Sequence, residues 1–146
     1  MIELKKIHKV SFLKNNIIEN IDERRKIFGV VGSFGDLLEI KQIKIIEFDE
    51  NAVSTKKVIG NHSHFASSNQ WEIIVVFGKK TASQIDFRYR NYSEKKIRKK
   101  ILKGGVVVVI PPGCALALRP LKHDVKIIEI SNKIYNAKNY IVDELF

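Results

Sequence analysis

The sequence predicts an all-β protein folded as a single domain. Short runs rich in Val, Ile, Phe and Tyr alternate with Gly, Pro, Asn and Ser, a pattern typical of strands separated by turns. The 146 residues, 45% of them hydrophobic, suffice for one sizeable core but not for two domains and a linker. This composition excludes collagen-like and wholly disordered chains.

Six segments carry the clearest strand signal. Residues 85–90 alternate strictly between apolar and charged side chains, which places Ile85, Phe87 and Tyr89 on one face of a sheet and the charged residues on the other. The sequence Pro111-Pro112-Gly113 forces a sharp turn, because proline cannot continue a central strand. The predicted strands are 43–48, 72–77, 85–90, 106–110, 115–118 and 125–130.

Three further segments are less regular. Residues 17–28 fit one or two helical turns or an irregular edge strand. Residues 94–102 fit a helix or a strand, because their two isoleucines lie four residues apart and share a face in both; the following Gly104-Gly105 and the all-β setting favour a strand. Residues 132–146 are predicted to form a short C-terminal capping segment, turn-like or weakly helical.

The formal net charge of +10 favours anionic partners. The most basic run, 95–100 with Lys103, contains no aromatic residue, so we expect lysines that protect an exposed strand edge rather than a nucleic acid site. The single cysteine, Cys114, cannot form an internal disulfide and no secretory signal opens the sequence, which favours a cytoplasmic location. Every apolar run is far shorter than the roughly 18 residues expected of a membrane span.

Two of the four histidines, His62 and His64, lie two residues apart in the sequence Gly60-Asn61-His62-Ser63-His64. In a strand this spacing points both imidazole rings to the same face. Such a pair suits a metal site or a proton-transferring base with a helper, and the alternative is two solvated histidines beside a Gly-Asn turn. Because the pair borders a predicted core strand, we favour a functional site. We expect His8 and His123 on the surface.

A second motif surrounds the Pro-Pro-Gly turn. Gly105, Pro111 and Gly113 match the second motif of the cupins, which runs glycine, five residues, Pro-x-Gly, two residues and a histidine. The His pair followed by Gly78 resembles the first motif of the same family. This resemblance implies an antiparallel β-barrel of the jelly-roll type with a site in its mouth. Leu116 stands where the second motif has its histidine.

The metal-ligand set that the resemblance implies is incomplete. The first motif has an acidic or amide ligand with six residues between it and the glycine, and Trp71 occupies that position, between Gln70 and Glu72. A shift of one residue along a strand turns a side chain to the opposite face, so a complete ligand set needs a bulge that brings Glu72 or Gln70 inward. The candidate metal ligands are therefore His62, His64 and Glu72, with a divalent metal as an alternative rather than a required cofactor.

Shorter stretches resemble a narrower group of cupins. The ending 135–146 is similar to the closing Y-x-x-x-x-Y-I-x-D-x-x-x-F pattern of ketoisomerases and epimerases that act on thymidine-diphosphate 4-keto-6-deoxyhexoses, with one residue fewer before the final Phe. The sequence around the His pair also resembles the G-N-H-x-H of sugar-processing cupin domains in polysaccharide pathways. The resemblance implies a nucleotide-sugar isomerase or epimerase that forms a homodimer, with an N-terminal strand-rich extension able to pair with the second subunit.

Moving a keto group along a sugar ring requires a base that removes the proton beside the carbonyl and an acid that returns one to the neighbouring carbon through an enediol. His62 and His64 are the candidate catalytic residues, one as the base and the other as its orienting or relaying partner. Two other functions fit the same residues. One is a non-catalytic cupin that binds a sugar or another anionic small molecule, and the other is a metal-dependent cupin with atypical ligands.

The candidate substrate-binding residues are basic or aromatic. Arg88, Arg90 and Arg119 suit a diphosphate, and Tyr89 suits stacking on a base or sugar. Alternation puts Tyr89 on the opposite face from its two neighbouring arginines, so only one set can face a pocket; the alternative is a solvated charged face with Tyr89 in the core. Lys57 lies in the approach to the His pair, where ketoisomerases carry arginine.

Overall fold

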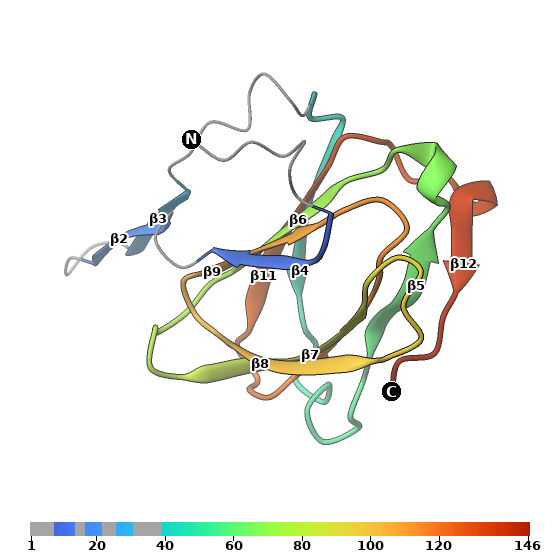
Figure 1. Cartoon of the computed structure of the whole chain (residues 1–146). Helices are drawn as coiled ribbons and strands as arrows, with labels where there is room; N and C mark the ends of the chain where they lie inside the picture. Colours follow the sequence, from blue (N-terminus) through green and yellow to red (C-terminus); the bar gives the residue numbers. More distant parts are fainter. Residues whose placement is uncertain (1–7, 14–16, 22–25, 31–38) are drawn as a thin grey trace.

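The computed structural model describes residues 8–13, 17–21, 26–30 and 39–146, with the backbone alone for 17–21 and 26–30. Two antiparallel five-stranded sheets face one another (Figure 1). The first sheet contains, in spatial order, β1 (Ser11–Leu13), β9 (Val106–Ile110), β6 (Glu72–Val76), β11 (Lys126–Ser131) and β4 (Gln42–Glu47). The second contains β12 (Tyr140–Val142), β5 (Ile59–His64), β10 (Ala115–Pro120), β7 (Ser83–Arg90) and β8 (Arg98–Lys103).

The remaining elements are short. Strands β2 (Ile17–Ile21) and β3 (Lys26–Val30) pair with each other as a separate two-stranded sheet. Single 3-10 turns, η2 (Ala66–Ser68) and η3 (Ala137–Asn139), precede β6 and β12. No helix in the described part of the chain is long and apolar enough to cross a membrane.

The core lies between the inner faces of the two sheets. Alternate residues of each strand point inward, so Ile74 and Val76 of β6 meet Phe87 of β7 and Leu118 of β10, all almost fully buried. In β7 the predicted alternation is confirmed: Ile85 and Phe87 are buried and Tyr89 packs against the same core. Burial of each of these side chains stabilises the fold by about 1.5–3 kcal/mol, and this determines which face of each strand points inward.

Most of the predicted strands are confirmed within one or two residues at each end. The favoured strand in 94–102 is confirmed as β8, and the ambiguous segment 17–28 contains β2 and begins β3. The prediction for the C-terminal segment is right about a short turn, η3, but wrong in missing β12. That strand forms because residues 140–142 pair with β5, a partner some eighty positions earlier in the chain that no local pattern reveals.

Candidate active site

One extra residue in β5 sets the orientation of the His pair. In the pairing of β5 with β10, Leu116 lies opposite His62 and Ala117 lies opposite Gly60, so Asn61 is left as a bulge. Gly60 and Asn61 have φ angles of 83° and 53°, in the left-handed region. A Cβ on Gly60 would lie 2.8 Å from a backbone oxygen of β10, so glycine is required there. The bulge turns the following residues so that both histidine rings face the interior.

His64 is held by acceptors at both ring nitrogens. Its Nε2 lies 2.9 Å from Oε1 of Glu72, and its Nδ1 lies 3.2 Å from the carbonyl oxygen of Asn139. A carboxylate and a carbonyl can only accept hydrogen bonds, whereas the side-chain amide nitrogen of Gln70, which can only donate, lies 3.1 Å from the same Nε2. Burial alone would lower the pKa of His64, but the hydrogen bond and charge of Glu72 outweigh it and raise the pKa above its usual 6.5.

Glu72 faces the interior, contrary to the expectation that a bulge would be needed to turn it inward. It shares the inner face of β6 with Ile74 and Val76, and β6 pairs regularly with both neighbours. Counting back from Gly78 gave the wrong face for Glu72. Strand β6 ends at Val76, before the glycine, so the position of the glycine does not determine which side chains of the strand point inward. Burial alone would raise the pKa of the Glu72 carboxyl, but the two neighbouring imidazoles hold it at about 2.

His62 differs from His64 in having an uncommitted nitrogen. Its Nε2 lies 3.9 Å from Oε1 of Glu72, beyond hydrogen-bond distance, and its Nδ1 has no hydrogen-bond partner among the described residues. The ring stacks on Tyr140, with centroids 4.5 Å apart and planes 29° apart. The hydroxyl of Tyr140 donates to the carbonyl of Gly60 at 3.3 Å. Tyr140 therefore fixes the plane of the imidazole, and Glu72 is the described residue that faces its Nε2.

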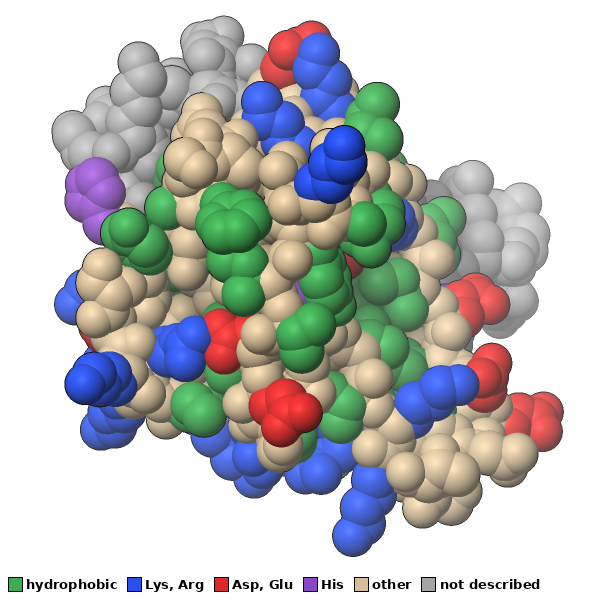
Figure 2. All heavy atoms as spheres, turned by 90° about the vertical axis from the view of Figure 1, so that its right-hand side faces the viewer, with side chains coloured by type: hydrophobic (Ala, Val, Ile, Leu, Met, Phe, Trp, Pro, Cys, Tyr) green, Lys and Arg blue, Asp and Glu red, His purple; other side chains and the backbone are tan. Residues whose placement is uncertain are grey.

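These side chains line a cleft of about 310 Å³ that opens between β4 of the first sheet and β5 of the second. Lys44 and Glu129 also line it and form an ion pair of 2.6 Å. Figure 2 looks onto the side of the molecule with β5 and β12 and shows hydrophobic side chains around a hollow in which a little of a histidine is visible. The volume is at the lower end of the range for small-molecule sites. We refer to this space as the His cleft.

Three donors in the His cleft suit a metal ion. One ligand atom each from His62, His64 and Glu72 lies within 4.8 Å of the other two. Two imidazoles and a carboxylate form a ligand set found in catalytic zinc sites. At the position of the family's fourth ligand, Leu116 offers no donor and packs beside His62.

The structure does not bring Arg88 or Arg119 to the His cleft. Both lie on the outer face of the second sheet, where their guanidinium groups sit 4.0 and 4.5 Å from the ring centre of Phe146. Arg88 also donates to the carbonyl of Leu145 at 3.0 Å, and Arg119 donates to Asp86 at 2.8 Å. The two arginines thus fasten the C-terminal residues, because alternation sends Arg88 of β7 and Arg119 of β10 to the outer face.

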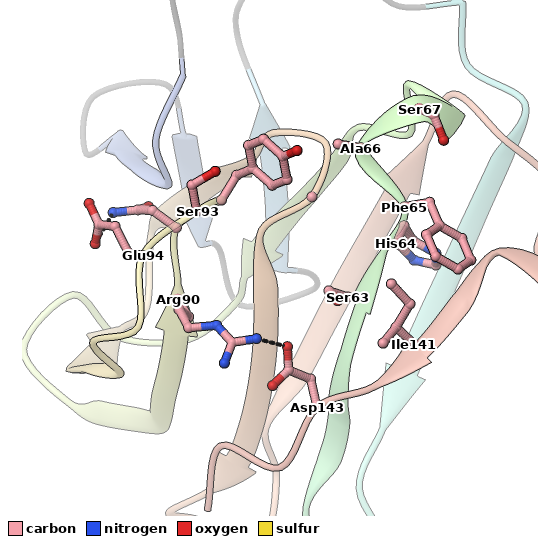
Figure 3. Close-up of a pocket in the computed structure, with 13 residues that line it drawn as sticks. Ser63, His64, Phe65, Ala66, Ser67, Arg90, Ser93, Glu94, Ile141 and Asp143 are labelled. Carbon is pink, nitrogen blue, oxygen red and sulfur yellow. Dashed lines mark hydrogen bonds and ion pairs between the residues drawn. The ribbon is translucent and has the colours of Figure 1, made fainter.

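Arg90 lies on the same outer face. Figure 3 shows it directed towards Asp143, with which it forms an ion pair, beside a hollow that also contains Ser63. Tyr89, on the inner face, stacks on Phe87 with centroids 5.4 Å apart and does not line the His cleft. Lys57 is exposed and pairs with Asp49 at 3.1 Å. None of these predicted substrate-binding side chains therefore lines the His cleft.

Sequence reasoning missed several residues of the His cleft. Asn139 and Tyr140 reach the histidines through the pairing of β12 with β5. The closing pattern of the C-terminal segment contained Tyr140 but gave no indication of its contact with His62. Lys44 could have been predicted from the alternation in β4. It is a charged residue on the same face as Ile46, which packs against the core.

No protein-family model matches the chain, and no curated protein matches it in sequence. Solved structures do match. A TDP-quinovose 3,4-ketoisomerase from Campylobacter jejuni is 18% identical with a TM-score of 0.66, covering 94% of this chain and 95% of that one. A variant of a 3,4-ketoisomerase from Thermoanaerobacterium thermosaccharolyticum, in complex with TDP-4-keto-6-deoxyglucose, is 15% identical with a TM-score of 0.65, covering 94% and 89%.

A third match is the dTDP-4-dehydrorhamnose 3,5-epimerase of Bacillus anthracis, with TDP and pyrophosphate bound. It is 14% identical with a TM-score of 0.65, and the match covers 90% of this chain and 76% of that one. At these identities the likeness concerns the fold. The predicted all-β jelly roll is confirmed, and the chain has the cupin fold that TDP-sugar 3,4-ketoisomerases and this epimerase share.

Proposed function

We propose that the protein is a nucleotide-sugar isomerase or epimerase that removes a proton beside a sugar carbonyl. The observation that carries the proposal is the free Nε2 of His62, which lies in the His cleft 3.9 Å from the ionised Glu72. The cupin fold shared with TDP-sugar ketoisomerases and an epimerase supports the same reaction class by analogy.

His62 is the base in this account. Its Nε2 takes the proton from the carbon beside the carbonyl, and the electrons of that bond form an enediol. The imidazolium that results is stabilised by Glu72 and by the stacked ring of Tyr140. The former carbonyl oxygen gains a proton as the enediol forms. Protonation of the former carbonyl carbon, with loss of the hydroxyl proton on the neighbouring carbon, then places the carbonyl on that neighbour. Reprotonation of the carbon that first lost its proton, from its opposite face, inverts its configuration instead.

His64 is a positioning residue in this account. Both of its ring nitrogens already have partners, the Asn139 carbonyl at Nδ1 and the Glu72 and Gln70 side chains at Nε2. It holds the carboxylate of Glu72 in place beside His62. The electrostatic cost of burying Glu72 is offset by this ion pair, which keeps the carboxylate charged at neutral pH.

The substrate in this proposal is an anionic sugar derivative. The chain has a net charge of +10, which favours anionic ligands. Two of the solved neighbours have TDP or a TDP-sugar bound. A nucleotide sugar whose sugar enters the cleft while its diphosphate stays nearer the surface fits these observations.

The test is incubation with TDP-4-keto-6-deoxyglucose, followed by NMR assignment of the carbonyl position in the product. The proposal predicts a product with the carbonyl on the neighbouring carbon or with inverted configuration there, and predicts that His62→Asn abolishes it. Saturable binding without any product, with this and related nucleotide sugars, would favour the non-catalytic sugar-binding alternative.

A metal-dependent cupin is the second candidate, favoured by the convergence of His62, His64 and Glu72. These residues would hold the ion, which would polarise a carbonyl or bound water. The test is the metal content of purified protein after dialysis, together with turnover after chelation. Stoichiometric metal whose removal abolishes turnover would replace the metal-independent account.

We propose further that the protein is a homodimer joined through the β4–β11 side of the outer face of the first sheet. This face is apolar along four adjacent strands, whereas the outer face of a sandwich is ordinarily polar. On β4 its side chains are largely exposed, 61% for Ile43 and 71% for Ile45. Ile128 and Ile130 beside them on β11 are half-buried, whereas the residues of β6 and β9 on this face are already covered within the chain, at most 1% exposed: Ile73, Val75, Val107 and Val109.

Sedimentation velocity tests the dimer. Ile45→Glu places a charge in the proposed interface and should yield a monomer, whereas Val142→Glu, a matched change at an exposed position of the second sheet, should leave the dimer intact. A wild-type protein that sediments as a monomer at micromolar concentration would refute this assignment.

A further inference from the structure

A second cleft, of about 330 Å³, lies at the opposite edge of the sandwich from the His cleft. It opens between the edge strands β1 and β8, and its walls include Phe12, Lys80, Lys100 and Lys103. We refer to it as the lysine cleft. None of the described residues that line it carries a carboxylate.

Close backbone packing brings Lys80, in the loop between β6 and β7, to the end of β8, which carries Lys100 and Lys103. The loop between β6 and β7 and the turn between β8 and β9 lie side by side in Figure 1. At Gly104 an added Cβ would lie 1.9 Å from the carbonyl oxygen of Gly78, so the two backbones are in direct contact. At Gly105 an added Cβ would lie 3.2 Å from Cγ of Lys80, so the aliphatic part of this lysine lies over the turn. The glycines thus let Lys80 approach Lys103.

The charges in the lysine cleft are not neutralised by the described part of the chain. Lys80, Lys100 and Lys103 form no ion pair with a described carboxylate, whereas nearby Lys99 and Arg98 pair with Asp86 and Glu94. Three ammonium groups around one concave space repel one another and focus a positive potential, which an anion relieves. The ammonium group of lysine binds phosphate as a point charge.

We propose that the lysine cleft binds a small anion with two or more phosphate groups, at a site separate from the His cleft. Its volume suits a small molecule. Single-stranded nucleic acid is disfavoured because Phe12, the aromatic ring in the wall, is engaged. The Nζ atom of Lys100 lies over the Phe12 ring, 4.2 Å from its centre, and the ring makes T-shaped contacts with Phe87 and Tyr89. The face of the ring under the Lys100 ammonium is therefore not open to a stacking base.

The test is isothermal titration calorimetry with inorganic tripolyphosphate at low ionic strength. The double variant Lys80→Ala/Lys103→Ala should weaken binding by about tenfold or more, because each lysine makes a charge-assisted contact. The matched control Lys95→Ala/Lys96→Ala removes the same charge from exposed positions outside the cleft and should keep the wild-type affinity. Circular dichroism of both variants confirms the fold.

Three outcomes would overturn the proposal. Equal weakening by the two double variants would show diffuse attraction to a basic surface, and loss of tripolyphosphate binding in His62→Asn would place the anion in the His cleft. A single-stranded oligonucleotide that binds more tightly than tripolyphosphate and is unaffected by the Lys80→Ala/Lys103→Ala change would indicate a nucleic-acid surface elsewhere. Because this assay involves no turnover, its result is independent of the proposed isomerase activity.

Discussion

The Nε2 atom of His64 lies 2.9 Å from Oε1 of Glu72, and this buried ion pair joins β5 of the second sheet to β6 of the first. Both side chains are almost inaccessible, 6% and 5% exposed. The pair therefore serves two purposes in the account. It ties the two sheets together at the mouth of the His cleft, and it keeps a carboxylate charged beside His62.

The first prediction concerns the pH dependence of this pair. The raised pKa of His64 contributes stability fully below about pH 6.5, its usual value, and that contribution is lost as pH rises through the folded-state pKa. The lowered pKa of Glu72 contributes stability above about pH 4.5 and loses it as pH falls towards 2. The pair is thus most stabilising between these two values.

Glu72→Gln should therefore lower the free energy of unfolding most strongly near pH 6, by about 3–5 kcal/mol for loss of one buried partner. The difference from wild type should shrink towards pH 9. Urea denaturation at several pH values measures it. Glu47→Gln, which breaks the exposed pair with Lys126, should change little at any pH. A pH-independent difference at position 72 would contradict the assigned protonation states.

The second prediction concerns the bulge in β5. Gly60→Ala introduces a Cβ against the backbone of β10 at a positive φ, and should cost about 1–3 kcal/mol and turn His62 away from Glu72. Turnover should fall more than stability alone explains, as measured on the fraction that remains folded. Ser63→Ala, on the outer face of the same strand, serves as the control. Full activity in folded Gly60→Ala would show that the bulge does not orient the base.

These two predictions also show where sequence reasoning reached its limit. The spacing of His62 and His64 was enough to predict a shared face, because strand periodicity is local. The face of Glu72 was not predictable, because it depends on where the connection after His64 ends and β6 begins. The contact of Asn139 with His64 depends on a pairing between distant strands, which no local pattern contains.

The arginines also show what local sequence patterns cannot predict. Alternation correctly separated Tyr89 from Arg88 and Arg90, and the apolar set faces the core. The sequence did not reveal that the C-terminal residues fold back over the outer face, where Leu145 and Phe146 contact Arg88. Cationic residues that resembled a diphosphate site therefore serve to fasten this segment.

The third prediction concerns the position of the family's missing histidine. Leu116 lies opposite His62 and lines the His cleft, so Leu116→His adds a third imidazole to His62, His64 and Glu72. This variant should retain roughly one zinc ion per chain after dialysis, as four protein ligands bind zinc firmly. Elemental analysis measures it, with Leu116→Met as a volume-matched control that adds no nitrogen donor. An unchanged zinc content in a folded Leu116→His variant would show that the donors do not converge.

The most direct test of the central claim, that Nε2 of His62 is the base, is proton NMR of TDP-4-keto-6-deoxyglucose in heavy water with each histidine variant. The account predicts that wild-type protein exchanges the proton on a carbon beside the carbonyl. His62→Asn should abolish this exchange, and His64→Asn should slow it by displacing Glu72. Exchange that persists in folded His62→Asn, or no exchange with wild-type protein, would contradict the account.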